Sequence, residues 1–194
     1  RLWSFLNKTQ KDILDQWRGR GDLKAAVEKE IDRKLNNKGI LDTLRQKLEV
    51  DNIELTLYYP KPSPSDSEQS HRDFAANEWS VTRQQKYSKY HPGNEIDMVV
   101  FINGLPLFTI ELKNPATHQT ARYDGIKQYR ENRDPRDILL KFARCLAHFT
   151  LDKDEVFFTT RLEGKNTYFM PFNQGLPNGQ GAGNPINPNG HKTA

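Results

Sequence analysis

Three residues in the middle of the chain have the side-chain types that hydrolytic sites use: Asp97, Glu111 and Lys113. Glu111 and Lys113 lie two positions apart at the end of an apolar run that predicts a strand, so their side chains share one face. Asp97 stands at the start of a second apolar run. Because an isolated carboxylate is costly to bury in a strand, a cation or hydrogen bonds must compensate it. We therefore expect the three side chains to converge.

Two carboxylates on adjacent strands offer hard oxygen ligands to a metal ion. Such a pair suits Mg²⁺, with Mn²⁺ as a substitute, because Mg²⁺ keeps several waters and binds through one or two carboxylates plus substrate phosphates. Asp97 and Glu111 are the expected metal ligands, and Lys113 would orient or help to deprotonate a water and offset transition-state charge. The three residues thus predict hydrolysis of a phosphodiester backbone, and the alternative is an interstrand salt bridge.

The convergence depends on the turn that joins the two runs. Asn103-Gly104 is a hairpin dipeptide between them. A two-residue loop would place Asp97 and Glu111 on opposite faces of the hairpin. A three-residue loop over 103–105, or an equivalent bulge, would set the two carboxylates opposite each other. We therefore predict the three-residue form.

Hydrophobic patterning predicts the elements around the hairpin. Helices are expected from Asn7 or Thr9 to Trp17 and from an Asp22 cap to about Leu35, ending near Asn36–Gly39. Further helices are predicted over about 117–131 and 136–147, and strands over 53–57, 79–87, 96–102, 105–113, 156–160 and 167–169. This order predicts an α/β fold, a mixed central sheet of about five strands flanked by helices, with the site at one edge of the sheet.

The composition limits the functional classes. The chain has 194 residues, suiting one domain, with a net charge of +4 and a pI of about 9.1 that agrees with a polyanionic partner. Its one cysteine, Cys145, excludes an internal disulfide and a cysteine-based zinc site. No membrane-length apolar run and no signal-peptide pattern is present in the sequence. We therefore expect a soluble cytoplasmic protein without a membrane partner.

The motif and its surroundings resemble a known family. Asp97 and Glu111-Leu112-Lys113 resemble the D…ExK signature of the PD-(D/E)xK nuclease superfamily, with Ile96 in place of its proline. From about Trp79 onward the chain resembles the amino-terminal nuclease domain of the restriction (R, HsdR) subunit of Type I restriction-modification enzymes. The segments that carry this resemblance are EIDMVVFINGLPLFTIELKNP, QYRENRDPRD, DEVFFTTRLEGKNTYFMPFN and GAGNP.

The resemblance implies a restriction-endonuclease-like core with a helical N-terminal region. It implies a Type I site-specific deoxyribonuclease that cleaves double-stranded DNA with Mg²⁺ and without base specificity of its own. Its implied partners are methylation and specificity subunits and the motor domains of the same subunit, where ATP would bind. On this basis residues 1–172 are the expected endonuclease domain, divided into a helical part, 1–50, and a nuclease core, 51–172. The Gly/Asn/Pro-rich stretch 173–194 would link it to a motor domain.

The family's accessory Gln-xxx-Tyr motif has two matches after the catalytic strand. Gln119 and Tyr123 fit the spacing, whereas Gln128 and Tyr129 fit the position better, and the choice stays open. The early acidic residue of the superfamily would be Glu30 or Glu28, and Glu30 is the preferred candidate. The basic side chains expected to contact DNA phosphates are Arg83, Lys86, Arg122, Lys127 and Arg130.

Two other functions compete with this interpretation. One is a non-catalytic DNA- or protein-docking module that retains the nuclease fold. The other is a free-standing nuclease or junction resolvase of the same superfamily.

Overall fold

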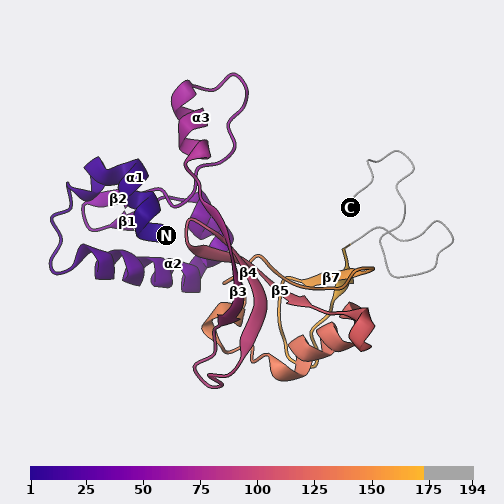
Figure 1. The fold of residues 1–194 in the computed structure, drawn as a ribbon. Helices are drawn as coiled ribbons and strands as arrows, with labels where there is room; N and C mark the ends of the chain where they lie inside the picture. The colour runs from indigo at the N-terminus through magenta and orange to yellow at the C-terminus, as the bar shows by residue number, and fades with distance from the viewer. Residues whose placement is uncertain (173–194) are drawn as a thin grey trace. The chain divides into compact units, whose positions relative to one another are not determined.

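The computed structural model describes residues 1–172 as parts of two compact units (Figure 1). Unit 1 comprises Arg1–Val81 and Val100–Leu107, and unit 2 comprises Thr82–Val99 and the chain from Phe108 onward. The predicted linker, 173–194, lies outside the described residues.

Unit 1 contains three helices and a small hairpin. The helices are α1 (Leu2–Leu14), α2 (Leu23–Arg45) and α3 (Glu68–Ala75), and the hairpin consists of β1 (Leu48–Val50) and β2 (Ile53–Leu55). Helix α1 contacts β2 and α2 contacts β1 (Figure 1). Asp22 caps α2 as predicted, because its carboxylate accepts hydrogen bonds from the backbone N–H groups of Lys24 and Ala25.

Helix α2 has the predicted buried face, with Val27, Ile31 and Leu35 in the core. The predicted end near residues 36–39 is confirmed, because Gly39 has non-helical angles (φ 76°, ψ 176°) that separate this segment from a second helical segment, which runs to Arg45. Buried residues beyond Gly39 include Ile40, and this second apolar segment explains why the helix resumes. Among the described residues no helix is long and apolar enough to cross a membrane.

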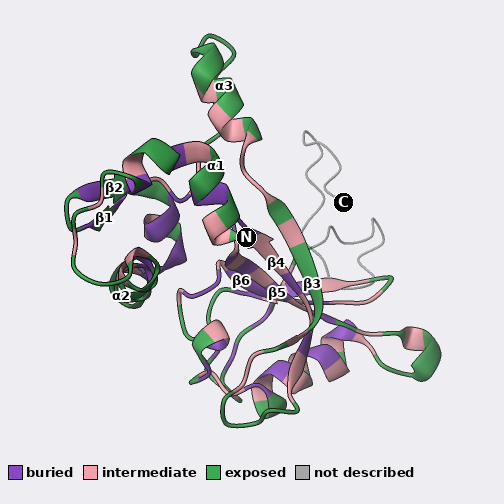
Figure 2. Cartoon of the chain, turned by 60° about the vertical axis from the view of Figure 1, so that its left-hand side comes forward, coloured by how far each residue is buried: buried purple, intermediate pink, exposed green. Residues whose placement is uncertain are grey.

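Within residues 1–172 the central sheet has six strands in the order β3-β4-β5-β6-β7-β8. Strands β5 and β6 are parallel, whereas β6, β7 and β8 pair antiparallel, so the sheet is mixed as predicted. Strand β3 is largely exposed (green in Figure 2). The fold class is confirmed, with six strands in place of about five and β8 in place of the predicted strand over 167–169. The strands are β3 (Trp79–Lys86), β4 (Glu95–Ile102), β5 (Leu105–Leu112), β6 (Ala147–Leu151), β7 (Val156–Thr159) and β8 (Met170–Pro171).

The β4–β5 turn has two residues, so the predicted three-residue loop is wrong. Asn103 and Gly104 have φ angles of 50° and 84°, as a two-residue type I′ turn requires. Asn103 is fully buried, and its side chain accepts from the Glu78 N–H at 2.7 Å and donates to the Leu57 carbonyl at 2.9 Å. These bonds hold the asparagine in its left-handed conformation and fix the shorter turn.

The predicted helix over 136–147 is also wrong. Only Ile138–Leu140 forms a short 3₁₀ turn, and the chain from Ala147 onward is strand β6. Ile138 and Phe142, which lie within the predicted helix, are 45% and 63% exposed. A helix through residue 147 would leave the β5 backbone without the partner that β6 provides, and pairing of buried backbone groups outweighs the local pattern.

The predicted helix after β5 forms, but with π-helical turns. Thr120 caps it by accepting from the Tyr123 N–H, and the helical segments η2 (Ala121–Gly125) and η3 (Gln128–Asn132) follow. Segment η2 contacts β6 and β7 and so lies against the sheet. Gly125 permits this approach, because an added Cβ would overlap the Thr150 hydroxyl of β6. The helix therefore lies over the part of the sheet where the candidate catalytic residues end β5.

Candidate active site

The structure brings Asp97 and Glu111 together. Asp97 lies near the start of β4 and Glu111 near the end of the neighbouring strand β5. Asp97 Oδ2 accepts a 2.7 Å hydrogen bond from the N–H of Leu112, the residue after Glu111. Because β4 and β5 are interior in the strand order, the site lies at strand ends and not along an edge strand, which corrects the expected position.

The turn alone could not place these carboxylates. Burial in β5 alternates strictly, but in β4 it recurs every third residue, at Ile96, Val99 and Ile102. Burial alone therefore does not assign Asp97 to a face of the hairpin. Asp97 reaches the end of β5 through the backbone N–H of Leu112, even though the turn has two residues.

Glu111 is fully buried and forms an ion pair with Arg133. Arg133 Nε donates to Glu111 Oε1 at 2.7 Å, and the two side chains are 6% and 0% exposed. Arg133 Nη2 also donates to the Glu95 carbonyl at 2.7 Å. The other carboxylate oxygen, Glu111 Oε2, is buried without a hydrogen-bond partner. The predicted site residues do not include Arg133, and only its place in a basic stretch distinguished it in the sequence.

Burial dominates the electrostatics of Glu111. Removal from water raises its pKa to about 7, and the negative charge of Asp97 acts in the same direction. Arg133 and Lys113 oppose this effect and favour the ionised form. The carboxylate therefore changes its charge near neutral pH, far above the usual range of a glutamate.

Lys113 is held by the helix that follows β5. Its amino group donates a hydrogen bond to Gln128 Oε1, 15 residues further along the chain. Gln128 lies in η3, in the segment predicted by position, and its neighbour Tyr129 is fully buried. The structure thus places the Gln128 side chain at the lysine.

Tyr129 belongs to a buried network beneath the site. Its hydroxyl lies 2.8 Å from Thr109 Oγ1, and that oxygen lies 2.7 Å from His148 Nδ1. Thr109 shares the face of β5 that carries Glu111. Burial lowers the pKa of His148 to about 4, so the imidazole is neutral at neutral pH. Tyr129 and His148 pack and support the floor of the site.

The other accessory candidates lie elsewhere. Gln119 is exposed and Tyr123 is 72% exposed, and no side-chain bond joins either residue to Lys113. Glu30 lies on α2 in unit 1, where its carboxylate accepts from Arg33 Nε at 2.9 Å, a bond that lowers the pKa of Glu30. Glu28, also on α2, is 4.0 Å from Lys24. Both glutamates thus have neighbours on their own helix.

The five predicted DNA-contacting side chains differ in availability. Arg122 is engaged by Glu155 at 2.8 Å, and Arg130 donates to the Thr167 carbonyl at 2.7 Å. Both therefore have structural partners. The remaining three side chains, Arg83, Lys86 and Lys127, are exposed. Lys86 and Lys127 each lie 4.0 Å from a glutamate carboxylate.

Asp97 and Glu111 fit a divalent cation in the chemistry of their oxygens. Glu111 Oε2 is a buried acceptor with no partner, which a cation would satisfy. Across residues 1–172 no group of three or more His, Cys, Asp or Glu side chains is arranged to hold a metal ion. Two carboxylates, with water and substrate oxygens as the other ligands, match the coordination that Mg²⁺ prefers in proteins.

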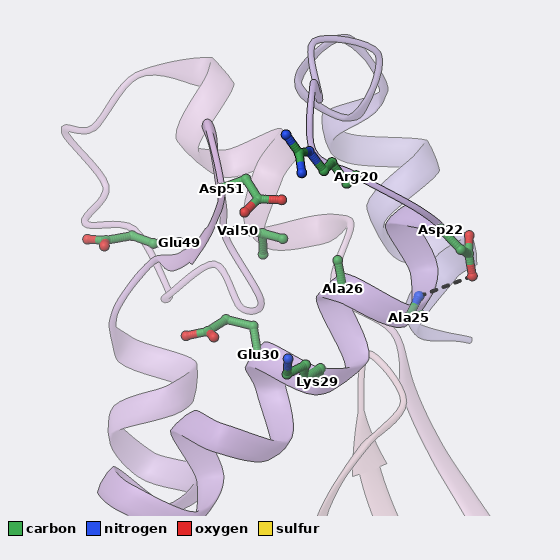
Figure 3. A pocket seen from close by; sticks show the side chains of 9 residues that line it. All are labelled: Arg20, Asp22, Ala25, Ala26, Lys29, Glu30, Glu49, Val50 and Asp51. Atoms are coloured by element: carbon green, nitrogen blue, oxygen red, sulfur yellow. Dashed lines mark hydrogen bonds between the residues drawn. The ribbon is translucent and has the colours of Figure 1, made fainter.

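A separate pocket of about 430 Å³ lies in unit 1 and includes Glu30 (Figure 3). It contains neither Asp97 nor Glu111. Its charged side chains have both signs, which gives no preference for an anionic or a cationic ligand. They are Arg20, Asp22, Lys29, Glu30, Glu49 and Asp51.

Comparisons with known proteins give two matches. The chain is 25% identical over 183 residues to a threonine–tRNA ligase of Methanococcus aeolicus, in a match that covers 84% of this chain. The chain spans only 28% of the length of that ligase, so the match transfers no activity. A family described as the N terminus of the Type I restriction enzyme R protein matches residues 3–167, which include the whole candidate site. The chain therefore belongs to the family of Type I restriction enzyme R proteins, whose N-terminal region it carries.

Proposed function

We propose that this region is the nuclease of the R subunit and hydrolyses the backbone of double-stranded DNA with the help of Mg²⁺. The observation that carries the proposal is the hydrogen bond from the Leu112 N–H to Asp97, which brings this carboxylate to the strand end that carries Glu111 and Lys113. The unpartnered Glu111 Oε2 supports it, because a buried acceptor of this kind needs a cation or a donor.

Asp97 and Glu111 would hold the cation. When bound, a divalent cation polarises a phosphate and lowers the pKa of a coordinated water. The Asp97 carboxylate is oriented by the Leu112 N–H, and the Glu111 carboxylate by Arg133. Both orientations exist in the protein before any substrate binds, which lowers the cost of organising the site during the reaction.

Lys113 would act on the reacting phosphate. Its amino group gives one hydrogen to Gln128, which leaves further hydrogens for a substrate oxygen or an attacking water. A donor fixed in place stabilises the negative charge that develops on the phosphate oxygens in the transition state. Gln128 would thus position the lysine without touching the substrate.

The DNA would be held by its phosphates and not by its bases. Exposed Arg83 and Lys86 on β3 and Lys127 on the helix are the cations available for such contacts, which carry no sequence information. Recognition of a target would then come from specificity and methylation subunits, and ATP would act in motor domains of the same subunit.

One observation favours a second candidate, the non-catalytic docking module. Glu111 is fully buried and already paired with Arg133, as in a structural salt bridge. In that case neither carboxylate would bind a cation, and the fold would serve assembly alone.

Calorimetric titration of the purified chain with Mn²⁺ separates the two candidates. The nuclease proposal expects binding by the wild type and its loss in Asp97→Asn, while Asp124→Asn, which alters a carboxylate on the neighbouring helix, keeps it. In the assembled restriction enzyme, Lys113→Ala is expected to abolish cleavage of unmodified DNA. Unaltered cleavage by both Asp97→Asn and Lys113→Ala would overturn the nuclease proposal.

A further inference from the structure

Arg133 is built into the site more firmly than a surface ion pair. Its guanidinium donates to Glu111 Oε1 and to the Glu95 carbonyl, each at 2.7 Å, and its side chain is 6% exposed. It also lies 5.8 Å from the centre of the Tyr87 ring. A planar group held by two acceptors and by an aromatic face keeps one orientation.

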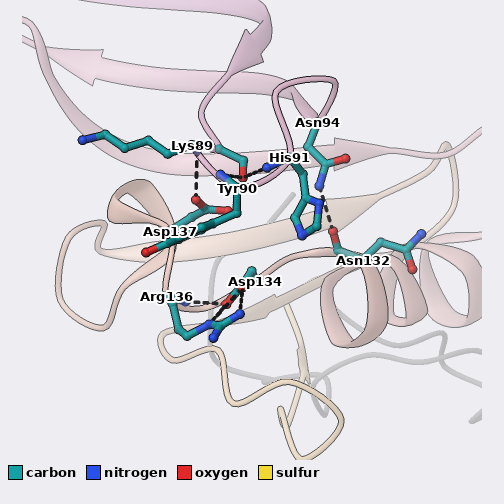
Figure 4. A network of polar contacts seen from close by, with 9 residues as sticks. Lys89, Tyr90, His91, Asn94, Asn132, Asp134, Arg136 and Asp137 are labelled. Atoms are coloured by element: carbon teal, nitrogen blue, oxygen red, sulfur yellow. Dashed lines mark hydrogen bonds and ion pairs between the residues drawn. The ribbon is translucent and has the colours of Figure 1, made fainter.

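The backbone on both sides of Arg133 is tied to the loop that precedes β4 (Figure 4). Asn94 Nδ2 donates to the carbonyl of Asn132 at 3.4 Å, and the Lys89 N–H donates to Asp137 Oδ1 at 3.3 Å. Asp137 is itself buried. Arg133 lies between these two ties, which hold its segment beside the start of β4 and keep the guanidinium within reach of Glu111.

This anchoring makes the two oxygens of Glu111 unequal. Oε1 is occupied by Arg133, whereas Oε2 is buried and has no partner. Oε2 is therefore the oxygen that is free for a cation. A cation that bound both oxygens would have to share Oε1 with the positive guanidinium, whose charge opposes it there.

We propose that Arg133 is a positioning residue that restricts Glu111 to one-oxygen coordination and thereby makes the site select Mg²⁺ over Ca²⁺. Mg²⁺ accepts octahedral coordination by single carboxylate oxygens and waters, whereas Ca²⁺ takes six to eight oxygens and commonly both oxygens of one carboxylate. The positive charge of Arg133 offsets the negative charge of Glu111 and weakens the attraction of the site for both ions alike. The discrimination therefore comes from the number of Glu111 oxygens that coordinate the ion. This inference rests on the proposed cation site.

The test is a competition experiment on the purified chain, in which Mg²⁺ or Ca²⁺ displaces bound Mn²⁺. The electron paramagnetic resonance signal of free Mn²⁺ measures the displacement. In Arg133→Gln, the affinity for Ca²⁺ relative to that for Mg²⁺ is expected to rise by roughly tenfold or more, which is the size of effect that residues bonded to metal ligands have on metal affinity. Arg133→Lys, which keeps the charge and a donor, should restore much of the preference. Arg136→Gln is the matched control, because Arg136 is exposed and pairs with Asp134.

A second measurement covers the case in which Arg133→Gln does not fold. Infrared difference spectra of the wild type, with glutamate labelled by ¹³C, report from the splitting of the carboxylate bands whether Mg²⁺ binds one oxygen or two. The one-oxygen pattern is expected, and its absence from Glu111→Gln assigns it. The two-oxygen pattern, or an unchanged Mg²⁺/Ca²⁺ ratio in folded Arg133→Gln, overturns the inference while cation binding itself stands. Failure of the wild type to bind Mn²⁺ overturns both this inference and the proposed nuclease.

Discussion

The amino group of Lys113 donates a hydrogen bond to the side-chain oxygen of Gln128, which joins the last residue of the D…ExK pattern to the helix that lies over the sheet. Of the two glutamines that the accessory motif allowed, this bond favours the one that fits by position. Gln119, which fits by spacing, is exposed and forms no such bond.

Gln128→Ala is expected to slow DNA cleavage by about 10- to 100-fold, because a catalytic group displaced by about an ångström loses that much rate. Gln119→Ala should leave the rate unchanged and is the matched control. The measurement is the rate of plasmid cleavage by the assembled restriction enzyme, with ATP-driven steps assayed separately. Equal rates for the wild type and Gln128→Ala would show that the lysine needs no such support.

Arg133→Met is expected to destabilise the chain by up to about 3 to 5 kcal/mol, because Glu111 is then buried without its partner and must stay unpaired or take up a proton. The double variant Glu111→Leu/Arg133→Met should recover most of this loss, since two apolar side chains can fill the same space. Urea denaturation measures both. Arg136→Met, at an exposed position, should change stability by less than about 0.5 kcal/mol. A double variant no more stable than Arg133→Met would contradict this account.

Gly125→Ala is expected to cost about 1 to 3 kcal/mol through overpacking between the helix and β6. The added methyl would overlap Thr150 Oγ1, and Thr150 Cβ would lie only 2.8 Å away. Adding Thr150→Ala should recover part of the loss, because it removes the overlapping hydroxyl. Thermal unfolding of the two single variants and the double variant measures this coupling, and simple additivity of the two losses would argue against the clash.

His148 is expected to make the fold sensitive to acid. Its pKa is about 4 in the folded protein, against 6.5 for an ordinary histidine, because burial disfavours the imidazolium. Between these values the unfolded chain binds the proton and the folded chain does not, so the stabilisation is complete above pH 6.5 and is lost as pH falls toward 4. From pH 7 to pH 5 this loss amounts to about 2 kcal/mol.

The matching measurement compares urea denaturation at pH 7 and pH 5 for the wild type and His148→Gln. From pH 7 to pH 5 the wild type should lose about 2 kcal/mol more of its free energy of unfolding than His148→Gln does. The Glu111 pKa is raised to about 7, so Glu111 acts in the opposite direction: its contribution is present at low pH and lost as pH rises through 7. The contribution of Glu111 is present in both the wild type and His148→Gln, so it drops out of the difference between them. His71→Gln, at an exposed histidine, should show no shift in stability relative to the wild type.

The sequence alone was enough to select Asp97, Glu111 and Lys113, because residue type and a two-residue spacing on an apolar strand are local properties. Local patterns also predicted the Asp22 cap and the face of α2 that carries Val27 and Ile31, since helix caps and periodicity involve neighbours in the chain. The mixed α/β class followed from the order of these elements.

The tertiary structure decided what depends on residues distant in sequence. The local pattern predicts that the start of β6 is the end of a helix. The segment is a strand because the β5 backbone needs hydrogen-bond partners, which β6 provides. Gln128 and Arg133 contact Lys113 and Glu111 across 15 and 22 residues, and no short-range pattern encodes such contacts. The candidate residues of this site were therefore predictable from single positions, whereas the contacts that support them form only when the helix folds against the sheet.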